Sequence, residues 1–184
     1  MRISVVGSSC SGKSTFSRRL SEITGVKHVP IDEYSHLPNW QERPTEELRE
    51  LIGLEAAAEE WIIDGNYTRT RDLVWPRVTL VIWLDLPFRI VFPRAVKRTT
   101  IRVITREELF AGNRETFSQS FLSRDSMIYY VAKTFWHRRR RIEGLLDEPQ
   151  HSAIPYVRLR STREVEHLLG EVRGHLYPER QRGE

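Results

Sequence analysis

Nine consecutive residues near the start of the chain, 7–15, have the composition of a phosphate-binding loop. Gly7, Gly12, Lys13 and Ser14 fit the pattern G-x-x-x-x-G-K-[ST], known as Walker A or the P-loop. Glycines let the backbone approach a polyphosphate closely, the lysine reaches the β- and γ-phosphates, and the hydroxyl ligates Mg²⁺. The motif predicts a nucleotide-binding loop made of Gly7, Ser8, Ser9, Cys10, Ser11, Gly12, Lys13, Ser14 and Thr15.

The residues on both sides of this loop have the patterns of a strand and a helix. Arg2–Val6 is a short β-branched run, which is typical of a buried strand. Phe16, Leu20 and Ile23 are spaced i, i+4, i+7 and predict a helix over Lys13–Thr24. Free N–H groups and the dipole at the start of such a helix favour an anion. This context supports a phosphate site over a ligand-free turn.

Acidic residues follow three further predicted strands. Asp32 follows a strand over 27–31, Asp64 follows 61–63, and Asp85 follows 79–84. Helices are predicted at about 45–59, with Thr45 as N-cap, from 88, at about 125–146 and from 162, with a fifth strand at 154–159. This alternation predicts a mostly parallel sheet with helices on both faces. Because ligands bind at the carboxyl ends of such strands, the three carboxylates are expected near the P-loop.

Each carboxylate has a chemical interpretation and a structural one. Asp64 is a candidate for holding magnesium through water, or is a turn residue before Gly65. Asp32 is a candidate base for an acceptor hydroxyl, or a structural cap. Asp85 is either a third site residue or a helix cap. A phosphate acceptor needs no base, so Asp32 with Glu33 favours an alcohol acceptor.

Arginines are frequent after residue 88. Arg94 and Arg98 lie one helical turn apart and are candidates for clamping the transferring phosphoryl group. Arg106 and Arg114, near Gly112, are candidate residues of a lid that excludes water. Further along, Arg138 shares the apolar face of its predicted helix and is expected to point inward.

Other conspicuous side chains have simpler interpretations. The run Arg138–Arg141 is expected as a solvated helix face, with a phosphate or nucleic-acid patch as the alternative. Tyr34 and Trp40 are either stacking platforms for a ring or ordinary core aromatics. The histidines have no metal-ligand spacing, so no zinc site is expected.

Composition restricts the class of protein. The chain has 184 residues, 39% of them hydrophobic and 29% charged, with no apolar run near the ~20 residues of a membrane span. A single cysteine and the absence of a signal-peptide pattern lead us to expect a cytoplasmic protein. The net charge of +4 hides an asymmetry: 32–72 has eleven acids and four bases (−7), whereas 89–143 has thirteen bases and five acids (+8). The basic half could gather phosphates or bind nucleic acid, but no nucleic-acid docking motif accompanies it.

Five features, taken in chain order, resemble the adenylate-kinase-like branch of P-loop kinases, the nucleoside and nucleotide kinases. They are the P-loop, Asp64-Gly65 after a strand, the next strand ending in Asp85, the Arg94/Arg98 pair, and the closing strand and helix over 157–165. The sequence is most similar to small bacterial kinase-like ATP-binding proteins, some labelled topology modulation proteins. The resemblance implies a five-stranded parallel sheet, a substrate-binding insertion at about 33–60 and a helical, arginine-bearing lid at about 104–124.

Two departures from that family's pattern bear on the acceptor. Nucleotide kinases follow Asp-Gly with Phe-Pro-Arg, whose arginine grips the acceptor phosphate, whereas here Asn66-Tyr67-Thr68 precede Arg69. Asp32-Glu33-Tyr34 is more similar to uridine-kinase-type enzymes, whose acceptor is a hydroxyl.

The sequence thus predicts one P-loop kinase domain over 1–177 and a polar tail over 178–184. We expect ATP- and Mg²⁺-dependent phosphorylation of a nucleoside-like or other hydroxyl acceptor, with a nucleoside monophosphate acceptor as runner-up. A nucleotide-dependent ATPase that binds nucleic acid or protein is the alternative from another class. The predicted catalytic residues are Lys13, Asp32, Arg94 and Arg98, and the predicted metal-binding residues are Ser14 and Asp64.

Overall fold

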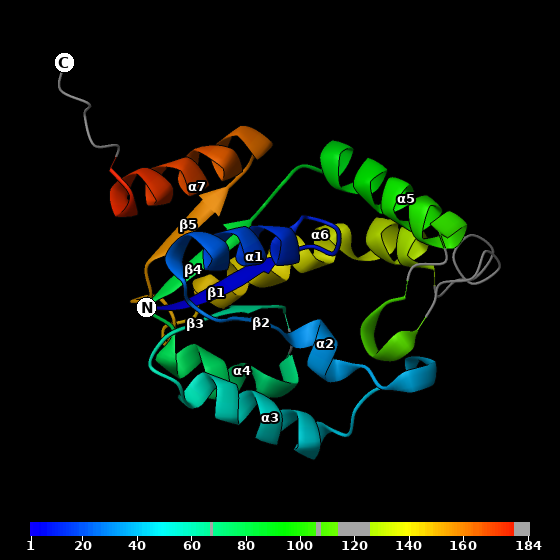
Figure 1. The fold of residues 1–184 in the computed structure, drawn as a ribbon, viewed down its shortest axis with the longest axis horizontal. Coiled ribbons are helices and arrows are strands. Elements are labelled where there is room, and N and C mark those ends of the chain that lie inside the picture. Colours follow the sequence, from blue (N-terminus) through cyan, green and yellow to red (C-terminus); the bar gives the residue numbers. More distant parts are fainter. Residues whose placement is uncertain (67, 106–107, 114–125, 179–184) are drawn as a thin grey trace.

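The computed structural model describes residues 1–66, 68–105, 108–113 and 126–178, and its centre is a five-stranded sheet (Figure 1). The strands run in the order β2-β3-β1-β4-β5, and every neighbouring pair is parallel. Their bounds are β1 Arg2–Gly7, β2 His28–Pro30, β3 Trp61–Asp64, β4 Leu80–Leu84 and β5 Tyr156–Leu159. The predicted parallel sheet is confirmed, and the P-loop follows its central strand.

Helices connect the strands and cover both faces of the sheet (Figure 1). Their bounds are α1 Lys13–Thr24, α2 Ile31–Ser35, α3 Thr45–Ala57, α4 Arg71–Val74, α5 Phe88–Thr105, α6 Met127–Leu146 and α7 Thr162–Leu176. Within the described ranges, no helix is long and apolar enough to cross a membrane.

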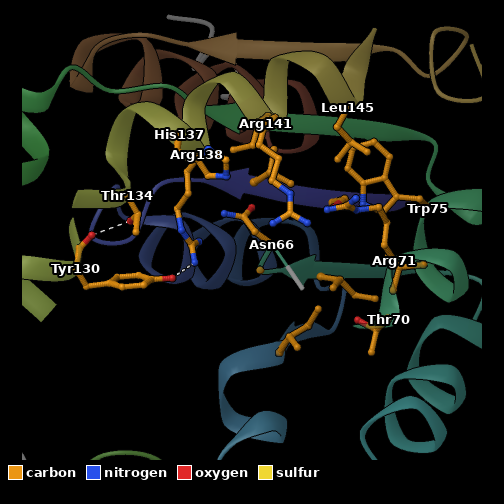
Figure 2. A pocket seen from close by; sticks show the side chains of 17 residues that line it. Asn66, Thr70, Arg71, Trp75, Tyr130, Thr134, His137, Arg138, Arg141 and Leu145 are labelled. Carbon is orange, nitrogen blue, oxygen red and sulfur yellow. Dashed lines mark hydrogen bonds between the residues drawn. The ribbon is translucent and has the colours of Figure 1, made fainter. Parts of the chain in front are cut away.

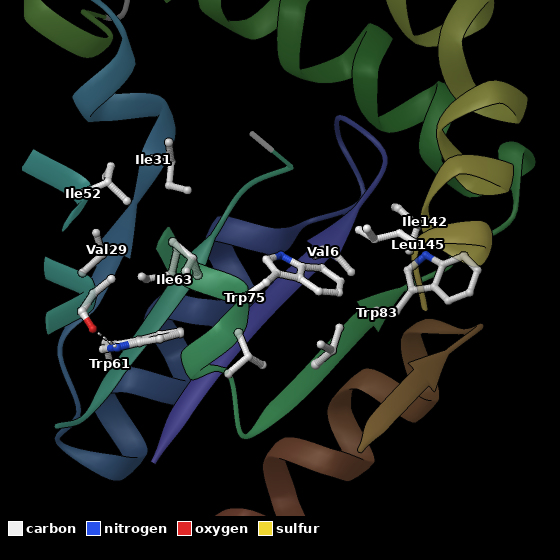
Figure 3. Close-up of a cluster of buried hydrophobic side chains, with 14 of the residues drawn as sticks. Val6, Val29, Ile31, Ile52, Trp61, Ile63, Trp75, Trp83, Ile142 and Leu145 are labelled. Carbon is white, nitrogen blue, oxygen red and sulfur yellow. Dashed lines mark hydrogen bonds between the residues drawn. The ribbon is translucent and has the colours of Figure 1, made fainter. Parts of the chain in front are cut away.

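Two apolar clusters fill the space between the sheet and its helices. Helices α1 and α7 pack on one face, where Phe16, Leu20 and Leu169 meet β1 and β4 residues. Helices α3, α4 and α6 pack on the other face, around Trp61, Trp75 and other apolar side chains (Figure 3). Since strands buried on both faces read as apolar runs, Trp61–Ile63 and Leu80–Leu84 were recognisable from the sequence.

A third cluster joins α5 to α6 beside the P-loop. Leu86, Val91 and Phe135 are buried in it, and Cys10 packs against it. Cys10 therefore serves at least as an apolar contact between the loop and this helix pair. The cluster fixes the arginine-rich α5 next to the nucleotide-binding loop.

Two sequence expectations differ from the fold. The strand predicted over 27–31 ends at Pro30, because the short helix α2 begins at Ile31. Thr45 was predicted as an N-cap, but the cap position is Pro44 and makes no side-chain cap bond. Pro93 lies inside α5. Most of the predicted lid, including Arg106, Arg114 and Arg124, lies outside the described residues.

Candidate active site

The loop between β1 and α1 has a backbone suited to enclosing an anion. Cys10 and Gly12 take left-handed φ angles of 63° and 98°. At Gly7 a Cβ would lie 2.7 Å from the Leu84 carbonyl oxygen and 2.8 Å from Ser11 Oγ, so only glycine fits. The first N–H groups of α1 lack intrahelical acceptors, as in every helix, and are available to a phosphate.

Lys13 is held back against this loop. Its Nζ donates to the Ser8 carbonyl oxygen at 3.1 Å. Burial lowers the pKa of Lys13; the nearby charges of Asp32 and Asp64 oppose this shift, and that of Arg138 adds to it. An anion near Lys13 would raise its pKa back toward the ordinary value. The charged form of Lys13 would therefore be stabilised by a bound polyphosphate.

Asp64, at the end of β3, is joined to the start of α1. It is completely buried, and Ser14 Oγ donates to its Oδ1 at 3.3 Å. His28 Nε2, on β2, lies 2.6 Å from its other oxygen. The register pairs Asp64 with Val5 of β1 and Pro30 of β2, which places the carboxylate beside the P-loop. The two predicted metal-binding residues are therefore in contact.

Asn66 ties the loop after β3 to the P-loop. Its side-chain nitrogen donates to the Gly7 carbonyl, and its Oδ1 accepts from the Gly7 N–H at 3.3 Å. This reciprocal pair holds the segment after Asp64 against the first residue of the loop. The residue occupies the position where nucleotide kinases have the phenylalanine of Phe-Pro-Arg, as noted from the sequence.

Asp32 lies in the first turn of α2, half-buried, rather than on a strand end. It is the first of the carboxylates whose charge raises the pKa of Lys13, so the fold brings it close to the P-loop lysine. Its carbonyl oxygen accepts from His36 Nδ1 at 2.8 Å. Glu33 beside it is exposed to solvent.

Helix α5 brings the predicted arginine pair to the opposite side of the loop. Arg94 Nη1 donates to the Ser11 carbonyl oxygen at 3.3 Å. Arg94 and Arg98 line one groove with Lys97, Ile101 and Arg102. Four cationic side chains thus share the surface next to the phosphate loop.

Two residues considered from the sequence are engaged elsewhere. Asp85 is buried and pairs with Arg158 at 2.8 Å and Arg139 at 3.0 Å, so it holds β4, β5 and α6 together. Arg69 donates to the Arg43 carbonyl at 3.3 Å and lies 3.5 Å from Glu42. Asp85 follows Leu84, which pairs with Gly7 of the P-loop, but its carboxylate is engaged by arginines of the fold.

The two aromatic side chains after β2 have different surroundings. Tyr34 packs against the main core and donates to Glu55 at 2.9 Å; burial and this hydrogen bond raise its pKa to about 12. Trp40 is 38% exposed and meets His36 edge to face. Tyr34 is thus a core residue, whereas Trp40 remains accessible.

A cavity of about 200 Å³ lies between the sheet, α4 and α6, next to this site (Figure 2). Asn66, which binds the P-loop, lines it, and so does Ile31, which precedes Asp32. Arg138 lines the cavity as expected, but Arg141 also lines it, and Arg139 pairs with buried Asp85. Placing the run Arg138–Arg141 on a solvated face was wrong, because successive side chains point in different directions around a helix.

Sequence reasoning missed several residues around the site. His28 was missed because its contact with Asp64 depends on strand order, which puts β2 beside β3. Arg71 was missed because it lies on α4, a helix of four residues that is too short to show an apolar period. Residues 65–72 form an almost wholly polar run, which contains no apolar period to indicate which side chains face inward.

Comparison with known proteins establishes the fold. A solved structure, the crystal structure of shikimate kinase from Aquifex aeolicus, superimposes with a TM-score of 0.50 at 17% identity. The match covers 97% of this chain and 99% of that one. No protein-family model matches the chain, and no curated protein does. The chain therefore has the fold of a P-loop kinase over nearly its whole length.

Proposed function

We propose that this chain is a kinase that transfers the γ-phosphoryl group of ATP to a hydroxyl group of a small molecule. One observation carries the proposal: a P-loop with left-handed residues presents Lys13 and Ser14 beside a buried carboxylate, Asp64, in a kinase fold. Phosphoryl transfer depends mainly on positioning and charge neutralisation, and these groups supply both.

The residues at the donor end fit a magnesium ion bound with the nucleotide. Mg²⁺ prefers oxygen ligands and keeps several waters, so one hydroxyl and one carboxylate suffice on the protein side. Ser14 and Asp64 would hold it, because their oxygens already lie 3.3 Å apart. The described residues contain no group of three His, Cys, Asp or Glu that could hold a metal by itself. The ion, when bound with ATP, neutralises charge on the phosphates.

Asp32 would act at the acceptor end as the base. It approaches Lys13 from α2, directly before the segment 33–60 that we assign to the acceptor. A carboxylate in this place helps an alcohol by accepting its proton, whereas a phosphate acceptor is already a nucleophile. Arg69, the counterpart considered for gripping an acceptor phosphate, is engaged with Arg43 and Glu42. Both observations favour a hydroxyl acceptor over a nucleoside monophosphate.

Arg94 and Arg98 would stabilise charge on the transferring group. The hydrogen bond from Arg94 to the Ser11 carbonyl orients its guanidinium at the loop that would hold the phosphates. Lys13 moves from the Ser8 carbonyl to the γ-phosphate when the nucleotide enters, since a charged acceptor is the stronger partner.

We further assign residues 1–177 to a single kinase domain, with residues 104–124 as its lid. The single cysteine, Cys10, fits a reducing cytoplasm.

Product detection by mass tests the reaction. The purified protein is incubated with Mg-ATP and separate pools of nucleosides, nucleoside monophosphates, sugars and hydroxy acids, shikimate among them. We expect one hydroxyl compound to gain one phosphate, and Lys13→Ala to abolish this. Gain of phosphate by nucleoside monophosphates alone would establish the runner-up. ADP production only after nucleic acid is added, with no phosphorylated compound, would replace the kinase by a nucleic-acid-dependent ATPase.

A further inference from the structure

The cavity beneath α6 has an unusual excess of positive charge. Figure 2 shows Arg138 and Arg141 reaching from α6 toward Asn66, with Arg71 approaching from α4. Among the described residues, none of the three arginines forms an ion pair with a carboxylate. Other ion pairs of the fold, such as Arg49 with Asp72 at 2.7 Å, lie outside this cavity.

The partners of these guanidinium groups are neutral. Arg138 donates to the Tyr130 hydroxyl and lies over its ring, 5.0 Å from the centroid. Arg141 donates to the Thr68 hydroxyl at 2.8 Å. No side-chain hydrogen bond of Arg71 occurs within the described part of the chain. Tyrosine and threonine hydroxyls orient a guanidinium but leave its charge uncompensated.

The lowered pKa of Arg71 is a further sign of excess positive charge in the cavity. Burial lowers its pKa, the positive charge of Arg141 lowers it further, and Glu148 opposes both more weakly. Bringing like charges together in a partly buried place is unfavourable. An anion between them would relieve this repulsion.

The cavity also contains an unsatisfied polar group. Thr70 is completely buried and lines the cavity, and its hydroxyl has no hydrogen-bond partner among the described residues. Buried hydroxyls are normally paired, so an unpaired one beside a cavity indicates a ligand or water. Asn66 and His137 add further polar atoms around the same space.

We infer that this cavity binds an anionic group of the phosphoryl acceptor, a carboxylate or a phosphate monoester, through Arg71, Arg138 and Arg141. Guanidinium groups bind both anions with paired hydrogen bonds. The inference rests on the proposed function, because it assigns the acceptor of the same reaction. The acceptor would carry a hydroxyl at Asp32 and an anion in the cavity, and the neighbouring Ile31 connects the two places.

The size of the cavity restricts the acceptor further. Drug-sized ligands occupy pockets of about 300–1,000 Å³. At about 200 Å³, this cavity suits a compact organic acid or phosphate ester better than a whole nucleotide.

Calorimetric titration with matched ligands tests the inference. Saturating Mg-ADP first fills the P-loop, which would otherwise bind the probes itself. The probes are inorganic phosphate, and the pairs D-gluconate with sorbitol and glycerol 3-phosphate with glycerol, whose members differ in one anionic group. We expect at least one anionic probe to bind about tenfold or more tightly than its uncharged partner.

Charge-removing variants locate the binding. Arg71 and Arg138 lie on different helices. Arg71→Gln and Arg138→Gln should each lower the affinity for the anion about tenfold or more. Arg140→Gln removes the same charge from exposed α6 surface outside the cavity and should leave binding unchanged. Circular dichroism confirms that each variant is folded.

The outcomes separate this inference from the proposed function. The anion site is overturned if all three anions bind weakly or not at all. It is also overturned if Arg140→Gln weakens anion binding as much as Arg71→Gln and Arg138→Gln do. Either result would stand even if an uncharged alcohol is phosphorylated. Anion binding that depends on Arg71 and Arg138, combined with no phosphoryl transfer to any pool, supports the site and overturns the kinase.

Discussion

Replacing His28 by leucine is expected to lower the thermal stability of the protein. Asp64 has no solvent exposure, and its donors are His28 Nε2 at 2.6 Å and the Ser14 hydroxyl at 3.3 Å. A hydrogen bond to a charged group contributes about 1.5–3 kcal/mol. For a chain of 184 residues this corresponds to a melting temperature about 3–12 °C lower.

Thermal unfolding followed by circular dichroism measures the effect. His167→Leu is the matched control, because that side chain is 75% exposed and its pair with Glu171 at 4.0 Å contributes little. The loss from His28→Leu should shrink when Asp64 is also changed to asparagine, which carries no charge. The reasoning would be refuted if the losses in melting temperature from His28→Leu and Asp64→Asn simply add in the double variant. Equal losses in His28→Leu and His167→Leu would also refute it.

The same change should affect catalysis through Asp64. Without His28 the carboxylate is free to rotate away from Ser14, so the variant should need more Mg²⁺ for half-maximal activity. A variant that loses stability but keeps the wild-type Mg²⁺ dependence would show that His28 serves only the fold.

Three further changes test separate parts of the site. Burial lowers the pKa of Lys13 from 10.5, so the unfolded chain binds more protons there and wild-type stability should rise with pH toward 10.5. Lys13→Met should lack this rise and, without nucleotide, melt a few degrees higher at neutral pH; a lower melting temperature would contradict this. Asp85→Asn should cost about 3 kcal/mol of unfolding free energy in a denaturant titration, because it breaks the buried pair with Arg158, yet leave the KM for ATP unchanged. Arg94→Ala should lower kcat by about three orders of magnitude, whereas Arg89→Ala, on exposed surface of the same helix, should not; equal rates would remove Arg94 from the mechanism.

Local patterns were sufficient to predict the sheet and most helices. The helix over Lys13–Thr24 was predicted with its observed bounds, since three apolar residues at helical spacing and the glycines before and after it mark both ends. Helix α2 was missed because its five residues are too few for a period. Thr45 was wrongly given the cap position, since Pro44 before it takes an extended conformation that can itself precede a helix.

Contacts between distant segments could not be predicted in the same way. Asp85 looked like a site residue because it ends a strand, but Arg158, which neutralises it, lies 73 residues later. The cavity combines side chains from β1, α4 and α6, and its existence depends on how those elements pack. Motifs were sufficient to predict a phosphate-binding loop and the candidate Asp32, whereas the cavity became visible only in the three-dimensional structure.

The most direct test of the kinase proposal follows the γ-phosphoryl group itself. ATP labelled at the γ-phosphate is mixed with Mg²⁺, the protein and the pooled hydroxyl compounds, and the label is traced by chromatography. We predict label in an ester of one small molecule, in amounts that grow with time and vanish in Lys13→Ala. Label released only as inorganic phosphate, or found equally with Lys13→Ala, would contradict phosphoryl transfer at this P-loop.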